Sequence, residues 1–507
     1  EERTKSQLII KIPSSIKITL QDANSLTNYT PITPTVRGTP ASQEAVFTPI
    51  SVRIEYELSN PATGVRFDTV LESQPQLWNA YTTNNELCCT AAYWMPCVNT
   101  LDEKCTWEVE ITVPKKVKDI GGSKVMGNET RNLRSRRDTH TDENEVKTED
   151  VSQEDILQKN DSQRPDEDED EEDYDILEEE EEDDASNKEI LVCCSEYSTA
   201  KETAHPTEIS KKCFAFQIFN PVAPHHVGWA VGAFNVWTLP SINSQDDIFD
   251  EERDESEESV KINEPDTSAA VDDIENNDVI PIQVYTLPQE DIDEKTVLNS
   301  TIICQKMMDF YAKEFGSYPF TSYCLVFLPT LVMPTMEFAS MTLCNTRLLS
   351  PPEMIDSMLT TTNHLAWSLA TQWSGVNITP LEINDIWCCL GMAGYMVFQL
   401  MKKILGYNEL KYRLKMNSEA IVELDWEKPP IGETFTNASR PISWTSKDLD
   451  FIKLKAPMVL YILDRRMVKT ERSFGMSRVL PKIFLQAMSG DLSNNSLSTA
   501  HFQYVCE

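Results

Sequence analysis

Alternation of apolar and polar residues predicts strands over the N-terminal part of the chain. Residues 8–20 alternate with a break at Pro13, and Val52 to Leu58 alternate more cleanly. A turn at residues 60–64 precedes a further short strand. Four later stretches are also predicted as strands: 104–114, 213–219, 228–234 and 280–287. The chain up to about residue 296 is therefore expected to be rich in β-structure.

From Val297 the apolar residues follow a helical period. Residues 301–315 place Ile302, Met307 and Tyr311 at helical spacing, ahead of a Gly-Ser-Tyr-Pro turn. Later helices are expected at 395–405, where Gly406 ends the helix, and at 478–487 and 498–506. Strands are expected at 324–328 and 336–340. A second region that mixes helices and strands therefore follows the β-rich one.

The net charge of −37 is concentrated in two segments. Residues 117–190 hold 28 acidic and 10 basic side chains, and residues 242–278 hold 15 acidic and 2 basic ones. About −6 remains for the rest of the chain, which is ordinary for a globular body. Neither segment can bury enough apolar surface to offset the entropy lost on ordering, so both are predicted to be disordered insertions.

The sequence has basic residues at 115–118 and 134–137. They are equally compatible with a nuclear-localisation patch and with isolated basic residues in a disordered loop. The thirteen cysteines include no C-x-x-C pair, which is typical of reduced thiols in a cytosolic or nuclear protein. No run of eighteen apolar residues predicts a membrane span. Adjacent histidines at His225 and His226 are expected to point apart, which argues against a metal site there. The sequence shows no glycine-rich phosphate loop and no basic aromatic stripe for single-stranded nucleic acid.

Residues 364–393 read as an apolar helix, a short loop and a second apolar helix. Their spacing resembles the signature H-E-x-x-H-x-W-F-G-N-x-V-T-P of the zinc aminopeptidases of the aminopeptidase N type. In that family a third metal ligand, a glutamate, follows the second histidine after eighteen residues. The framework positions of the signature are matched by Gln372, Trp373, Gly375, Thr379, Pro380, Asp385, Trp387, Gly391 and Ala393.

The positions that do the chemistry in this family hold other residues. Trp367 and Ser368 stand for the His-Glu pair, Thr371 for the second histidine and Leu390 for the ligand glutamate. Two imidazoles one helical turn apart and a carboxylate form a three-ligand zinc site, and the glutamate after the first histidine acts as general base. The indole, hydroxyl and isobutyl groups at these positions supply neither the metal ligands nor the general base. The resemblance therefore implies an inactive pseudoenzyme without metal or cofactor.

Two more segments extend the resemblance. Tyr-Trp-Met-Pro-Cys at 93–97, followed by Lys104 and Thr106, resembles a motif of the family's N-terminal β domain. Glu337 stands where the family grips the free amine of a peptide, although a lone carboxylate on an edge strand more often has a structural role. Lys453 stands where a tyrosine of the family stabilises the oxyanion.

An aminopeptidase scaffold without its ligands, carrying long acidic insertions, is similar to the aminopeptidase-like TBP-associated factors of the general transcription factor TFIID, with insertions of fungal type. This resemblance implies a nuclear, non-catalytic scaffold subunit that supports complex assembly and initiation by RNA polymerase II. It implies other TFIID subunits as partners and a role near the initiator DNA of the core promoter, with neither a membrane nor a small-molecule substrate. Lys402, Lys403, Lys411, Arg413 and Lys415 are a candidate phosphate-binding face, although a solubilising helix face is favoured.

The predicted fold class is a multidomain α+β protein, in which an antiparallel β-sandwich-like domain precedes a thermolysin-like domain. The predicted boundaries are 1–116, 191–241 and 279–296 for the β domain, 117–190 and 242–278 for the insertions, and 297–507 for the thermolysin-like domain. Two other functions stay open. One is a divergent peptidase or peptide-binding protein that uses Glu337 and the old cleft, and the other is a chaperone-like protein that acts through its acidic tracts.

Overall fold

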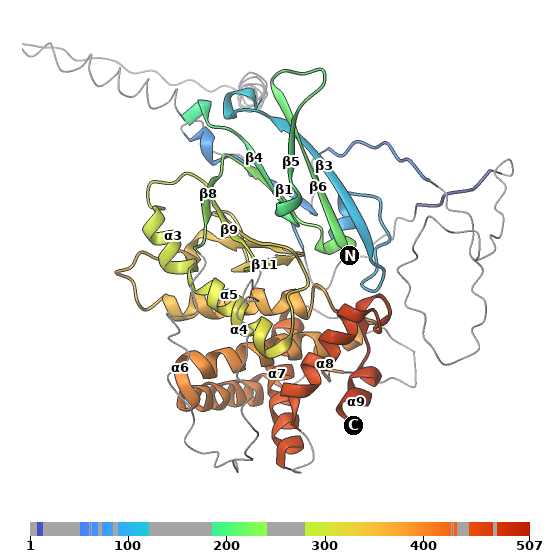
Figure 1. Cartoon of the computed structure of the whole chain (residues 1–507), viewed down its shortest axis with the longest axis vertical. Coiled ribbons are helices and arrows are strands. Elements are labelled where there is room, and N and C mark those ends of the chain that lie inside the picture. The colour runs from blue at the N-terminus through green and yellow to red at the C-terminus, as the bar shows by residue number, and fades with distance from the viewer. Residues whose placement is uncertain are drawn as a thin grey trace, which may run out of the picture.

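The computed structural model shows a body of strands and helices that extends from β1, which begins at Val65, to the C-terminus (Figure 1). The residues that the structure describes are 8–13, 51–59, 61, 63–68, 74–84, 90–120, 185–240, 279–426, 428, 430–432, 446–469 and 474–507.

Two antiparallel sheets form the N-terminal part. The first has four strands in the order β1-β2-β7-β4, and the second has three in the order β3-β6-β5. Both sheets join strands from the two sides of the first acidic segment. The strands are β1 (Val65–Asp68), β2 (Asn79–Thr82), β3 (Cys105–Pro114), β4 (Leu191–Cys194), β5 (Lys201–Ala204), β6 (Lys211–Val222) and β7 (Trp229–Gly232).

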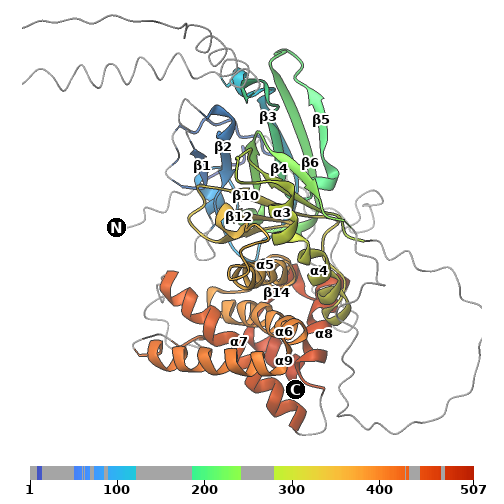
Figure 2. The same ribbon diagram turned by 90° about the vertical axis from the view of Figure 1, so that its left-hand side faces the viewer.

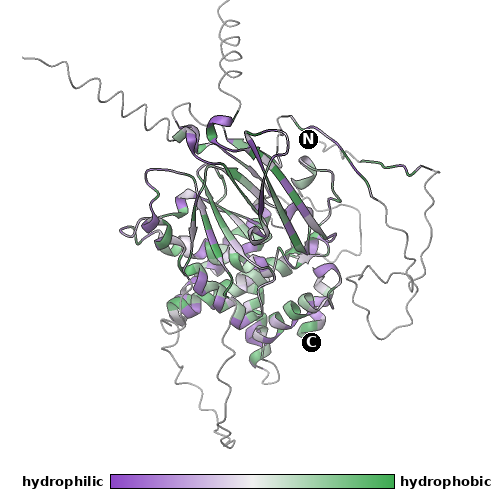
Figure 3. Ribbon diagram, turned by 45° about the horizontal axis from the view of Figure 1, so that its top comes forward, coloured by the Kyte–Doolittle hydropathy of each residue, from purple (hydrophilic) through white to green (hydrophobic). Residues whose placement is uncertain are grey.

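Strands β3 and β6 show the alternation that the sequence predicts. They pair antiparallel over almost their whole length, with a register shift between Cys105 and Trp107. Alternate residues of β6 are buried, and its inward row includes Phe214 and Phe216. Hydrophobic and hydrophilic residues therefore follow one another along these strands in Figure 3.

A mixed five-stranded sheet with the order β11-β12-β10-β9-β8 connects the N-terminal sheets to the helices. Its three central strands are parallel, and the two outer strands run antiparallel to their neighbours. Every residue of the central strand β10 is buried, because apolar clusters cover both faces of the sheet. The strands are β8 (Asn235–Thr238), β9 (Ile282–Thr286), β10 (Tyr323–Leu328), β11 (Thr335–Phe338) and β12 (Met341–Asn345).

Apart from α3, which lies at the level of the sheet, the helices gather below this sheet in both side views (Figures 1 and 2). Helix α5 contacts β11, α4 and α6, and α6 makes its most extensive contact with α7. The structure is therefore an α+β protein with more than one layer. The helices are α3 (Glu294–Thr301), α4 (Ile303–Phe315), α5 (Met358–Trp373), α6 (Ile386–Leu424), α7 (Ser446–Lys469), α8 (Met476–Ser489) and α9 (Thr499–Cys506).

Helix α6 consists of two segments that meet at Gly406. Gly406 has φ 82° and ψ 170°, a backbone conformation that L-residues with a side chain rarely adopt. The predicted end of the helix at this glycine is therefore correct for the first segment, and a second segment begins directly after it. Residues 383–424 include one window that is long and apolar enough to cross a membrane, but 67% of that window is buried inside the protein. Burial in the core accounts for its composition.

Three sequence predictions need correction. Residues 8–13 and 51–59 form no strand in the structure, and their apolar side chains are exposed, because an alternating segment becomes a strand only where it has a hydrogen-bonding neighbour. Residues 14–20 and 242–278 lie outside the described residues. The ends predicted for the first insertion are wrong, since Val117 and Ile190 are 6% and 0% exposed and belong to the core.

Candidate functional site

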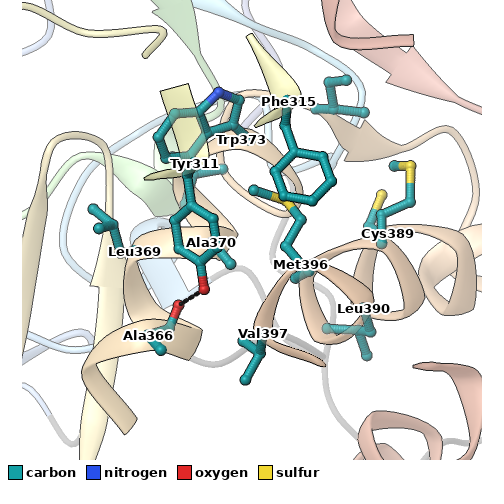
Figure 4. Close-up of a cluster of buried hydrophobic side chains, with 14 of the residues drawn as sticks. Tyr311, Phe315, Ala366, Leu369, Ala370, Trp373, Cys389, Leu390, Met396 and Val397 are labelled. Atoms are coloured by element: carbon teal, nitrogen blue, oxygen red, sulfur yellow. Dashed lines mark hydrogen bonds between the residues drawn. The ribbon is translucent and has the colours of Figure 1, made fainter. Parts of the chain in front are cut away.

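Helix α5 carries three of the degenerate positions, and its opposite face builds the core. Leu365, Leu369 and Trp373 are each 1% exposed and pack against α4 and α6. Figure 4 shows this side, where the Tyr311 hydroxyl donates to the Ala366 carbonyl oxygen at 3.2 Å. The packing fixes the rotation of α5 and so determines where Ser368 and Thr371 lie.

A hollow of about 210 Å³ lies between β11, α5, the start of α6 and α7. Such a volume holds roughly seven waters at ~30 Å³ each, or one amino-acid side chain. Its lining is largely apolar, with a few polar groups. The residues that line it include Asn84, His225, His226, Met336, Glu337, Thr371, Thr379, Leu390, Asp450 and Lys453. The hollow therefore brings four of the six predicted site residues together.

Glu337 lies on β11, an edge strand, as predicted. Its Oε1 atom accepts hydrogen bonds from Ser368 Oγ at 2.9 Å and from Thr335 Oγ1 at 2.8 Å. A carboxylate that already holds two internal hydroxyl donors is less available to a ligand amine. The side chain at the position of the family's general base therefore acts here as a donor that secures Glu337.

The remaining degenerate positions are filled by packing and local hydrogen bonds. Thr371 Oγ1 donates to the Ser368 carbonyl oxygen at 2.7 Å, and Leu390 is 4% exposed. The Trp367 ring lies 5.7 Å from Lys453 Nζ, within the range of a cation–π contact. A Cβ atom placed on Gly394 would lie 3.3 Å from Trp367 Cζ3, so the indole also lies against the α6 backbone.

The residues at these positions do not fit a zinc ion. Zinc is bound in proteins by histidine, cysteine and carboxylate groups, and Trp367, Thr371 and Leu390 carry none of these. Within the part of the chain that the structure describes, no group of three or more histidine, cysteine, aspartate or glutamate side chains could hold a metal ion. Lys453 also places a cation over Trp367, which opposes a divalent ion nearby.

The histidine pair lines this hollow and Lys104 acts electrostatically on both histidines, although the sequence did not assign these residues to the site. The His225 and His226 rings have centroids 4.0 Å apart, so the expectation that these side chains point apart is wrong. They lie in a 3-10 turn, Pro224–His226, rather than on a strand, which removes the alternation on which that expectation depended. Lys104 Nζ donates to the carbonyl oxygens of Asn377 at 2.7 Å and Asn495 at 3.0 Å.

These groups are kept neutral more easily than they would be in water. Burial, with Lys104 nearby, lowers the pKa of His225 to about 4. Burial also lowers the pKa of His226 well below its ordinary value of 6.5. Burial lowers the pKa of Lys104 from 10.5 to about 7, against the opposing effects of Cys389 and Asp102. The two histidines on the inner wall of the hollow are therefore uncharged at neutral pH.

The contribution of Lys104 to the free energy of unfolding is expected to rise with pH above about 7, and Lys104→Met is expected to remove this contribution, so the pH slope of stability is more positive in the wild type than in the variant. Between the folded pKa of about 7 and the unfolded value of 10.5, the unfolded chain binds the extra proton, so deprotonation favours the native state. The slope from one group is at most about 1.4 kcal/mol per pH unit. Urea denaturation from pH 7 to 9 measures it, with the exposed Lys201→Met as control, and equal slopes in wild type and Lys104→Met would contradict the prediction.

Comparison with known proteins follows this geometry. Residues 300–439 match the model of the peptidase family M1 domain. Human endoplasmic reticulum aminopeptidase 2 is 29% identical over 168 residues, which cover 32% of the chain and 16% of that protein. The match to the family model includes α5 and the first part of α6, where the degenerate positions lie. Both matches support an aminopeptidase-like character for part of the chain.

A second set of relatives extends over far more of the chain. Transcription initiation factor TFIID subunit 2 of Saccharomyces cerevisiae is 57% identical over 532 aligned residues, which cover 100% of the chain. The chain belongs to the TFIID subunit 2 family. The TFIID subunit 2 of Schizosaccharomyces pombe is 33% identical over 460 residues, covering 90% of the chain. The chain spans 38% and 35% of the lengths of these two TFIID subunit 2 proteins.

Proposed function

We propose that the chain is a non-catalytic scaffold of transcription initiation factor TFIID. The observation that carries the proposal is the set of side chains at the four catalytic positions of an aminopeptidase-like site: Trp367, Ser368, Thr371 and Leu390. Ser368 secures Glu337, Thr371 bonds within its own helix and Leu390 is buried, so each has a packing role. The similarity to TFIID subunit 2 over the whole chain supports the assignment.

We further infer a nuclear protein that assembles with other TFIID subunits and engages core-promoter DNA near the initiator. The name of the two fungal relatives supports membership of an initiation factor. In this proposal the hollow is a remnant of a reaction chamber and takes no substrate.

The proposed layout follows the strand pairings except at the boundary between residues 296 and 297, because β8 and β9 belong to one sheet with β10, β11 and β12. The N-terminal β domain, sandwich-like in the proposal, combines 1–116, 191–241 and 279–296, and the thermolysin-like domain is 297–507. Pairing of β3 with β6, and of β2 with β7, joins strands across the first acidic segment. Pairing of β8 with β9 does the same across the second. Acidic segments between paired strands are consistent with insertions into one domain, with the boundary corrections given above.

An alternative function is peptide binding in the retained hollow, next to the edge strand β11. The presence of the hollow favours this alternative, because the replaced residues have not filled it completely. The two hydroxyl donors on Glu337 weigh against it.

Affinity purification of the tagged chain from nuclear extract, followed by mass spectrometry, distinguishes the two functions. We expect other TFIID subunits to be enriched together, and Glu337→Ala to leave the recovered set unchanged, because assembly does not use the hollow. Recovery of a peptide or protein that disappears with Glu337→Ala, while the far-UV circular dichroism spectrum is retained, would instead support the peptide-binding alternative. Absence of TFIID subunits from the wild-type sample would refute the scaffold.

A further inference from the structure

An exposed group of aromatic and cationic side chains lies where α6 and α7 run side by side, away from the hollow. Its centre is Tyr407, directly after the break at Gly406. Lys411 Nζ, Lys402 Nζ and Arg465 Cζ lie 4.3, 5.9 and 5.9 Å from the Tyr407 ring centroid. Arg465 also donates to the hydroxyls of Tyr407 at 3.0 Å and Tyr461 at 3.3 Å. We call Lys402, Tyr407, Lys411, Tyr461 and Arg465 the Tyr407 cluster.

The positive charge of the Tyr407 cluster is not neutralised by ion pairs. Among the described residues, none of its three cations forms a salt bridge. The nearby acids have other contacts: Glu409 pairs with Arg413 at 3.0 Å, and Asp464 accepts from the Met476 amide at 2.8 Å. Asp464 does raise the pKa of Arg465, as a smaller cause than the hydrogen bond to Tyr461. Three cations packed against two phenol rings therefore face solvent in a protein of net charge −37.

Exposed aliphatic side chains adjoin these cations. On α7, Ile462 is 49% exposed and follows Tyr461, and Val468 is 44% exposed and follows Arg465 by three residues. The face thus offers cations at its centre and aliphatic groups around them.

We propose that the Tyr407 cluster docks an acidic peptide segment with an apolar centre, supplied by another protein chain. Charge complementarity requires an anionic partner, and two classes of macromolecule meet that requirement. Duplex DNA would use the cations through its phosphates but leave Ile462 and Val468 in water. An acidic peptide with apolar residues uses both kinds of group, so the exposed aliphatic side chains favour the peptide.

The probe for this site has the required chemistry and comes from the chain itself. Residues 166–184 contain sixteen acidic residues around Tyr174, Ile176 and Leu177. A fluorescent synthetic peptide of this sequence is titrated with the full 507-residue chain and followed by fluorescence anisotropy. We expect saturable binding that weakens but persists between about 50 and 200 mM salt, because apolar burial is not screened.

Two variants of the chain test the two kinds of contact. Reversing the cations by Lys402→Glu, Lys411→Glu and Arg465→Glu is expected to weaken peptide binding at least about tenfold. Ile462→Ser with Val468→Ser is expected to weaken it at least about threefold and to leave binding of a mixed-sequence 20-base-pair duplex unchanged. The matched control makes the same charge change at exposed lysines elsewhere, Lys201→Glu, Lys295→Glu and Lys313→Glu, and should retain most of the affinity.

Four outcomes would overturn the proposal. One is equal binding of a peptide with Tyr174→Ser, Ile176→Ser and Leu177→Ser, because the site would then recognise any polyanion. Another is an affinity that rises at least about tenfold when residues 166–184 are deleted from the chain, because the face would then be occupied by its own segment. Equal loss in the control and the cluster variant is the third. Tighter binding of the duplex than of the peptide, unaffected by the serine variant, is the fourth and would assign the face to nucleic acid.

Discussion

Trp373→Ala is expected to lower the free energy of unfolding by about 3–5 kcal/mol, the range for truncating a large buried aromatic residue. Trp373 is 1% exposed, and its ring makes edge contacts with Tyr311 and Tyr318 at centroid distances of 5.9 and 5.2 Å. Its Nε1 donates to the carbonyl oxygens of Gly316 at 2.9 Å and Ser317 at 3.1 Å, which the substitution would leave without this donor. Urea denaturation followed by far-UV circular dichroism measures the effect.

The matched control for this substitution is Trp426→Ala. Trp426 is 83% exposed, so its removal should change the free energy of unfolding by less than about 0.5 kcal/mol. If both variants have the same urea midpoint as the wild type, the prediction that Trp373 holds α4, α5 and the turn after α4 together is wrong.

Restoring the aminopeptidase side chains is expected to create a zinc site. The variant with Trp367→His, Ser368→Glu, Thr371→His and Leu390→Glu would carry two imidazoles one helical turn apart on α5 and a carboxylate on α6, next to the hollow. Lys453→Tyr is included to remove the neighbouring cation. We expect one zinc ion per chain by elemental analysis after gel filtration, with none bound by the wild type.

The control retains every substitution except the ligand glutamate, which is replaced by Leu390→Gln. Loss of one of three protein ligands should weaken zinc binding at least about 100-fold, or ~2.7 kcal/mol, by isothermal titration calorimetry. Equal zinc content in the wild type and the restored variant would mean that these positions are not the degenerate ligand set and that the alignment on which the proposed function depends is wrong.

The strand predictions were correct for those alternating segments that pair with another strand. Residues 104–114 and 213–219 alternate and form β3 and β6, since each lies beside the other in the sheet. Residues 52–58 alternate as clearly and remain unpaired. Periodicity describes which side of a strand is apolar, but pairing depends on residues far away in the chain, so the pattern alone could not separate these cases.

The candidate site was predictable as a set of positions and not as a set of contacts. The spacing of Trp367, Thr371 and Leu390 located the site because helix period and loop length are local properties. The bond from Ser368 to Glu337 joins residues 31 apart, and the bonds of Lys104 span 273 and 391 residues. Such contacts depend on how the sheets and helices assemble, which no local pattern encodes. The burial of His225 and His226 was missed for the same reason.

The two hydrogen bonds of Lys104 have a mechanical consequence for the whole molecule. The Lys104 amine of the strand-rich part donates to one carbonyl in the loop after α5 and to another just before α9. Its two hydrogen bonds therefore connect three segments that are far apart in the sequence. Separating the two parts would expose that amine and both carbonyls together. The strand-rich and helical parts should consequently melt in one cooperative transition, and their slowest amide protons should exchange with the same opening free energy.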